Sequence, residues 1–317
     1  MKVLKKEDEE AAFAQLMYYD RIRKFRDFLR NPFAAFILIP DRSFYVTIPV
    51  AILYALLSFF SVPMYLDFQT KIMILDDHLV IAGLIIFVPY AIFHQLWKRK
   101  VMGIEAAIPE FLERMAGINE IGLTIAQGLA LMVRTNLGVL SYEIKRIKRD
   151  LDWGANIEDA LVRFEHRIRT PSIARTVTLI TKASYMSGDI GEILSIAASD
   201  ARMSEILKRE RITSMLIYLV IVYLAFAVFL FVIGVILTMF LPLLVNQGGQ
   251  IAAMRGAPGA QTVSGDTFGI LVYHACLLQA LFSGLLAGYM GEGSLTDGVK
   301  HSCILLIIAL VVFNTLI

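Results

Sequence analysis

Histidine and cysteine are among the side chains of this 317-residue chain that could bind a metal or transfer a proton. The five histidines are scattered without metal-ligand spacing, and the sequence contains no P-loop and no dinucleotide-binding glycine pattern. His94 and His274 fall within or near predicted membrane helices, where a polar side chain can mark a proton path. Because no predicted membrane helix contains an acidic partner, a helix–helix hydrogen bond or an interfacial position is favoured. We therefore expect no enzymatic activity and no cofactor.

The two cysteines, Cys276 and Cys303, also fall in predicted membrane helices, towards opposite faces of the membrane. At the rise of an α-helix their depths differ by roughly 15 Å, which is too far for a disulfide. We expect both to be small buried hydrophobic residues.

The other candidate chemistry is electrostatic. Two basic groups in one polar stretch could form a docking face for an acidic protein surface. They are Lys145, Arg146, Lys148 and Arg149, followed by Arg163, Arg167 and Arg169. The alternative is a solvated helix face, paired with the nearby acids Glu143, Asp150, Asp152, Glu158 and Glu165.

A third basic group, Lys208, Arg209 and Arg211, precedes a long apolar run, and we expect it to anchor to anionic lipid headgroups. Nucleic acid is not an expected partner. Residues 98–211 carry 18 basic and 15 acidic side chains, without a basic patch interleaved with aromatic residues.

The elements that position these residues are membrane helices, since 57% of residues are hydrophobic, 18% are charged and the apolar residues are bunched. Five segments without Asp, Glu, Lys or Arg are long enough to span a bilayer: 44–63, 79–97, 215–245, 269–290 and 301–317. The third segment would extend about 46 Å against a hydrocarbon core of about 30 Å. We expect it to emerge from the membrane as a rod or to break near Pro242. In the fourth, Ala280, Gly284 and Gly288 form a small-residue face for helix packing.

Basic residues set the expected orientation. Residues 1–42 and 98–211 contain nine and eighteen of the 30 Lys and Arg residues. Five spans with a cytoplasmic amino terminus place both stretches inside and the carboxyl terminus outside. We expect a cytoplasmic segment at 1–43, two membrane helices at 44–97, a cytoplasmic domain at 98–213, and three membrane helices at 214–317 with an outer loop at 246–268. The first segment carries an amphipathic stripe that fits either the membrane surface or the polar domain: Tyr18, Ile22, Phe25 and Leu29.

Helix punctuation divides the polar domain. Glycine stops followed by Thr, Asn or Asp caps recur at 122–124, 154–156 and 188–189, and Thr170-Pro171 begins another helix. We predict six helices, at about 104–121, 125–135, 139–152, 157–169, 171–186 and 190–212. The fold class is therefore an all-α polytopic membrane protein with five transmembrane helices and a cytoplasmic six-helix domain.

Four motifs of the polar domain, in order and spacing, resemble the type II secretion F family. They lie at 108–112, 122–129, 154–161 and 183–194 and include Pro109, Gly122, Gly154, Ser187 and Gly188. The tail at 283–288, 291–294 and 300–302 is similar to the archaeal branch, the platform proteins of archaeal type IV pili and the archaellum. Together the similarity covers about two thirds of the chain. Many family members carry two such helical domains and this chain has one, so it is either a one-domain form or the carboxyl half of a longer protein.

The resemblance implies a non-enzymatic inner-membrane platform that works with a cytoplasmic hexameric ATPase and with pilin-like subunits in the membrane. A homodimer would suit this platform role. Some bacterial relatives have a Gly-Glu pair associated with metal binding where this chain has Ser184-Tyr185, so we expect no metal site. A secondary transporter or channel subunit is the alternative from another class. The uncharged membrane bundle joined to a large polar domain favours the platform.

Overall fold

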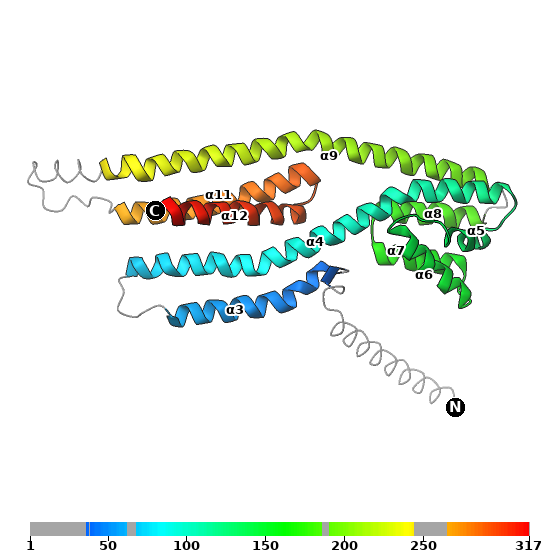
Figure 1. The fold of residues 1–317 in the computed structure, drawn as a ribbon, viewed down its shortest axis with the longest axis horizontal. Coiled ribbons are helices and arrows are strands. Elements are labelled where there is room, and N and C mark those ends of the chain that lie inside the picture. Colours follow the sequence, from blue (N-terminus) through cyan, green and yellow to red (C-terminus); the bar gives the residue numbers. More distant parts are fainter. Residues whose placement is uncertain (1–35, 38, 62–67, 186–189, 244–264, 317) are drawn as a thin grey trace, which may run out of the picture. The chain divides into compact units, whose positions relative to one another are not determined.

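The computed structural model describes residues 36–37, 39–61, 68–185, 190–243 and 265–316. Within these ranges the chain is helical and contains no strand (Figure 1). Five of the described helices are long and apolar enough to cross a membrane. The predicted all-α polytopic fold is thereby confirmed. The predicted amino-terminal stripe, most of the outer loop, and the Ser187, Gly188 and Asp189 motif lie outside the described residues.

The chain forms two compact units. The first is made from Met1–Trp97 and Ile221–Ile317, and the second from Lys98–Val220. The first unit holds α3 (Phe44–Ser61), preceded by the 3-10 turn η1 (Pro40–Ser43), together with α11 (Gly265–Glu292) and α12 (Leu295–Leu316). Two long helices, α4 (Phe68–Glu120) and α9 (Ile190–Val235), contribute residues to both units.

The length of α4 corrects one prediction. The second membrane span and the first helix of the polar domain are not separate elements, because α4 is continuous over 53 residues. The helix surface changes from apolar to charged at Lys98, Arg99 and Lys100. Lys and Arg are nevertheless strong helix formers, so the helix continues through these residues.

Near Pro242 the third span widens instead of breaking. A π-helical turn, η2 (Ile236–Phe240), follows α9 immediately before this proline. Proline has no backbone N–H and its ring clashes with the carbonyl four residues earlier, so the hydrogen-bond ladder must change register there. A π-turn is one way in which a helix absorbs that change.

The helices α11 and α12 form a closely packed hairpin. A Cβ atom built on Gly284 would lie 2.2 Å from the Ser302 Cα atom, and one on Gly288 would lie 2.0 Å from the Gly298 Cα atom. Ala280 is fully buried in the same unit. The backbones approach this closely because glycine has no Cβ, as small-residue faces in membrane helices allow.

The two cysteines lie in the core around this hairpin. Cys276 and Cys303 are both buried and neither forms a disulfide, which confirms their expected role. Apolar side chains from α9, α11 and α12 surround Cys276 in one cluster, among them Phe226, Leu230, Tyr273, Leu305 and Phe313.

Charged residues at the helix ends overturn the expectation that the histidines lack acidic partners. His274 Nε2 lies 2.9 Å from Asp76 Oδ2, and His94 Nδ1 lies 3.5 Å from Asp297 Oδ1. Asp76 belongs to the first turns of α4. Asp297 belongs to α12, which begins at Leu295 and not at the predicted residue 301. The turn between α11 and α12 is short because Gly293, with φ +79°, ends α11 only two residues before α12 begins. Hydropathy assigned both acids to loops.

Further polar contacts join helices of this unit. Tyr273 donates a hydrogen bond to Asp77, and the Tyr54 hydroxyl lies 2.8 Å from His78 Nδ1. Lys300 donates a 3.0 Å hydrogen bond to Gln95 Oε1 and pairs with Glu292. The Tyr223 hydroxyl lies 2.8 Å from His301 Nδ1. Each contact satisfies polar groups that would be costly alone among apolar helices.

The second unit contains α5 (Ile125–Met132), α6 (Leu140–Asp152), α7 (Ile157–Ile168) and α8 (Pro171–Tyr185), with the ends of α4 and α9. Gly122 and Gly154 both have φ +86°, as a helix stop requires. Thr124 forms a capping box with Gln127, and Asn156 accepts a hydrogen bond from the Ile157 N–H. The predicted punctuation at these positions is confirmed.

Candidate functional site

The predicted docking residues lie on α6, on α7 and just after α7. Helix α6 buries one face against α5 and α7, with Leu140, Ile144 and Ile147 in the core. These positions recur at helical spacing, so the polar residues between them fall on the opposite face.

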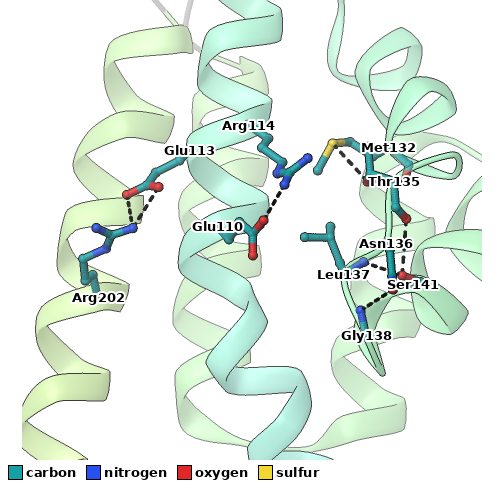
Figure 2. A network of polar contacts seen from close by, with 10 residues as sticks. All are labelled: Glu110, Glu113, Arg114, Met132, Thr135, Asn136, Leu137, Gly138, Ser141 and Arg202. Carbon is teal, nitrogen blue, oxygen red and sulfur yellow. Dashed lines mark hydrogen bonds and ion pairs between the residues drawn. The ribbon is translucent and has the colours of Figure 1, made fainter.

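The loop before α6 is held by its own polar groups. The Leu137 N–H donates a 2.8 Å hydrogen bond to Ser141 Oγ, and the Gly138 N–H donates one of 3.2 Å to Asn136 Oδ1. The Thr135 hydroxyl donates to the Met132 carbonyl oxygen at 2.7 Å. Figure 2 shows these contacts between the end of α5 and the start of α6. They define where α6 begins and therefore which residues its outer face presents.

A buried carboxylate uses two of the seven predicted docking residues. Glu143 is only 2% exposed, and it accepts a 3.0 Å hydrogen bond from Arg167 Nε. Arg146 Nη1 lies 3.9 Å from the same carboxylate, and Arg167 Nη1 lies 3.9 Å from Asp150 Oδ2. These pairs tie α6 to α7 and require no partner protein.

Two further predicted residues also have local roles. Lys148 forms a 2.6 Å ion pair with Asp152 one turn along α6. Arg169 is the C-cap of α7 with φ +59° and ψ +45°, and its Nε donates a 3.1 Å hydrogen bond to the His166 carbonyl. A cation at a helix C-terminus also complements the helix dipole. The paired-face alternative therefore describes Arg146, Lys148 and Arg167 well.

Lys145, Arg149 and Arg163 differ from the other four. All three are exposed, and among the described residues none of them forms an ion pair. Lys145 and Arg149 are one turn apart on the outer face of α6, so their charges remain available to a partner.

Aromatic residues flank these two cations, and sequence reasoning missed this. Tyr142 is 59% exposed and Trp153 is 86% exposed. With Lys145 and Arg149 they follow the three- and four-residue spacing of one helix face. We call Tyr142, Lys145, Arg149 and Trp153 the α6 stripe. The expectation that no basic patch is interleaved with aromatic residues is wrong here, and the spacing in the sequence was the signal that could have revealed it.

The predicted lipid-anchoring residues lie on α9. Lys208 Nζ is 2.6 Å from Glu105 Oε2 on α4, and Arg209 pairs with Glu205 at 3.1 Å. Arg211 is exposed and has no ion-pair partner within the described part of the chain. The structure thus gives Lys208 a role in joining α4 to α9 within the second unit.

A groove of about 750 Å³ runs between α4 and α9 in the second unit. Its lining combines apolar, hydroxyl and charged side chains of both signs: Ala106, Pro109, Glu110, Arg202, Glu205, Ile206, Arg209, Glu210, Thr213 and Ser214. Arg202 pairs with Glu113 at 2.7 Å, and Arg114 pairs with Glu110 at 2.5 Å (Figure 2). Most of the charged lining is therefore engaged in joining or stiffening the two helices.

The family motifs occupy structural positions. Pro109 lies inside α4 and lines the groove. Gly122 and Gly154 adopt positive φ after α4 and α6. No group of three or more His, Cys, Asp and Glu side chains in the described ranges has the arrangement of a metal site.

Comparison with known proteins identifies this helical region. Residues 111–238, from α4 through α5–α9 into η2, match the family described as type II secretion system (T2SS), protein F. An uncharacterized protein of Methanocaldococcus jannaschii is 24% identical over 211 residues, which cover 66% of this chain and 33% of that protein. The similarity thus spans about a third of the relative's length. No solved structure matches the chain. In this stretch of helices the chain is therefore similar to the type II secretion system protein F family.

Proposed function

We propose that the protein is the non-enzymatic membrane platform of a type IV pilus-like assembly machine, of the archaeal pilus or archaellum kind. In this role it couples a cytoplasmic hexameric ATPase to the insertion or extraction of pilin-like subunits. The observation that carries the proposal is the match of residues 111–238 to a secretion-system family, in a chain with five membrane-spanning helices. The relative from the archaeon Methanocaldococcus jannaschii supports the archaeal branch.

The continuity of α4 and α9 supports mechanical coupling. Each helix runs without interruption from residues of the helical domain into residues of a membrane span. A force applied to the domain would reach the membrane through two continuous hydrogen-bonded backbones. The ATPase supplies the energy, and the platform transmits it.

The proposed orientation places the helical domain and the amino terminus in the cytoplasm of a multi-pass protein of the inner cell membrane, and the carboxyl terminus outside. Cys276 and Cys303 are the only cysteines and both are buried, so their replacement by Ser leaves a background for single cysteines. A cysteine introduced within 246–268 should react with an impermeant thiol reagent on intact cells, and one at Lys145 should react only after lysis. Reaction at Lys145 on intact cells would overturn the orientation.

The proposal includes docking of the ATPase through Lys145 and Arg149, and reversing these two charges tests it. The double change Lys145→Glu and Arg149→Glu should abolish filament assembly and leave the domain folded, because neither side chain pairs within the described structure. Lys182→Glu on α8 is the matched control, since it reverses an exposed charge on another helix. Normal assembly by the double variant would remove α6 from the proposal.

The proposed platform is a homodimer, and Arg211 remains the proposed contact with anionic headgroups. The alternative function, a transporter or channel subunit, gains no support from the first unit. There the polar side chains of α4, α11 and α12 pair with one another.

A further inference from the structure

Trp153 is the most exposed large apolar side chain among the described residues of the second unit, at 86%. Its backbone is held firmly: its N–H donates a 3.1 Å hydrogen bond to the Arg149 carbonyl, and the next residue, Gly154, is the αL stop of α6. An indole presented to water by an ordered backbone loses little conformational entropy on binding. Tryptophan, tyrosine and arginine are also the residues that dominate the energetics of protein interfaces.

The cations beside Trp153 select the partner's charge. Lys145 and Arg149 have no ion pair within the described chain, whereas the flanking Lys148 is neutralised by Asp152 at 2.6 Å. The guanidinium carbon of Arg146 lies 5.9 Å from the centroid of the Tyr142 ring, so a cation–π contact helps to hold this ring beside the stripe cations. A face with two free cations between two aromatic rings complements an acidic surface.

We propose that the α6 stripe docks onto an acidic protein surface that contains an apolar pocket for the Trp153 indole. The identity of that protein as the secretion ATPase rests on the proposed function. Each residue of the contact has its own role. The Trp153 indole supplies affinity, while Lys145 and Arg149 raise the association rate and fix the orientation of the partner. Arg167 acts only by holding α7 against α6.

A protein fits the stripe better than a membrane surface. An interfacial helix needs a continuous apolar face to insert among the lipids, with cations on the other side. In α6 that apolar face consists of Leu140, Ile144 and Ile147, and it is already buried in the domain. A nucleic acid fits less well too, because residues 98–211 carry 18 basic and 15 acidic side chains and so lack the large excess of positive charge that binds a phosphate backbone.

The two tryptophans make the test direct, because Trp97→Phe leaves Trp153 as the sole indole of the full-length protein. This variant, in zwitterionic nanodiscs, would be titrated with the purified hexameric secretion ATPase of the source organism. We expect the Trp153 emission to shift to the blue and to become protected from acrylamide, because the indole leaves water. Trp153→Ala should weaken the Kd about 30-fold, as expected for a hot-spot residue. Lys182→Glu should leave the Kd unchanged.

The outcomes separate this inference from the proposed function. If the ATPase binds with no emission shift and Trp153→Ala binds equally well, the docking stripe is wrong and the platform function stands. If the ATPase does not bind the wild-type protein at all, the proposed function and the stripe both fail. An emission shift caused by phosphatidylglycerol vesicles or single-stranded RNA, and not by the ATPase, would replace the protein partner with a lipid or nucleic acid one. The emission measurement uses the native residue, so a folding defect in Trp153→Ala would not obscure it.

Discussion

Replacement of Arg167 by Ala should destabilise the contact between α6 and α7 much more than replacement of an exposed basic residue. Arg167 is 21% exposed and donates a 3.0 Å hydrogen bond to Glu143, which is 2% exposed. Removal of the guanidinium leaves a carboxylate buried without its main partner. Breaking a buried pair in this way costs about 3–5 kcal/mol.

The structure places the expected loss at the lower end of that range. Arg146 Nη1 remains 3.9 Å from Glu143 and compensates part of the charge. We therefore expect a loss of about 3 kcal/mol, which accelerates exchange of protected α6 and α7 amides about 100-fold. Hydrogen–deuterium exchange on the full-length protein in nanodiscs measures it directly, and Arg149→Ala is the matched control at an exposed position of α6.

A double variant separates charge burial from lost packing. Glu143→Leu with Arg167→Leu removes both charges, and replacing a buried pair by apolar residues is often nearly neutral. We expect its exchange to lie within about 1 kcal/mol of wild type, far from the single variant. If Arg167→Ala exchanges like Arg149→Ala, then Glu143 has another partner and the assignment of Arg167 as structural is refuted.

Three further changes test particular positions. Gly288→Ala places a Cβ atom 2.0 Å from the Gly298 Cα atom and should lower the Tm of the detergent-solubilised protein, whereas Gly269→Ala, with nothing within 4 Å of its Cβ, should not. Arg169→Ala and Arg169→Gly both lose the hydrogen bond to the His166 carbonyl, but only glycine avoids the cost of a left-handed non-glycine residue, about 1–2 kcal/mol, so exchange at the end of α7 should be slower in Arg169→Gly than in Arg169→Ala. Thr124→Ala removes the capping box of α5 and should cost about 1 kcal/mol, seen as faster exchange in its first turn. Equal Tm values for the Gly288 and Gly269 variants, equal exchange in the two Arg169 variants, or unchanged exchange in α5 would contradict the corresponding assignment.

The features predictable from the sequence are those set by neighbouring residues. Hydropathy located the five membrane helices because burial in lipid acts on about 20 consecutive residues. The stops at Gly122 and Gly154 and the cap at Thr124 were predictable because capping involves only the adjacent turn.

The continuity of α4 and the contacts between residues far apart in the sequence were not predicted. The continuity of α4 past Lys98 was missed because a change from apolar to charged residues looks like a boundary although both favour a helix. The partners of His94 and His274 were missed because their carboxylates lie at the ends of other helices.

The candidate site shows the same division. The basic residues of α6 and α7 are visible in the sequence, but the partner of Arg167 is Glu143, 24 residues earlier and buried by tertiary packing. Solvent exposure decides which of the seven basic side chains are available to a partner, and it leaves the Trp153 indole in water. The composition of the sequence does not reveal this exposure. The spacing of Tyr142 to Trp153 predicts a shared face but not that the face is the outer one.

The most direct test of the platform function is recovery of the secretion ATPase with this protein from native membranes. The tagged full-length protein, solubilised in mild detergent at 0.1 M salt, should copurify with the hexameric ATPase, and the amount should fall at 1 M salt, where the Debye length shrinks from about 10 Å to about 3 Å. The Lys145→Glu and Arg149→Glu variant should lose the ATPase, and Lys182→Glu should retain it. Absence of the ATPase from the wild-type sample, with the protein intact and folded, would contradict the account.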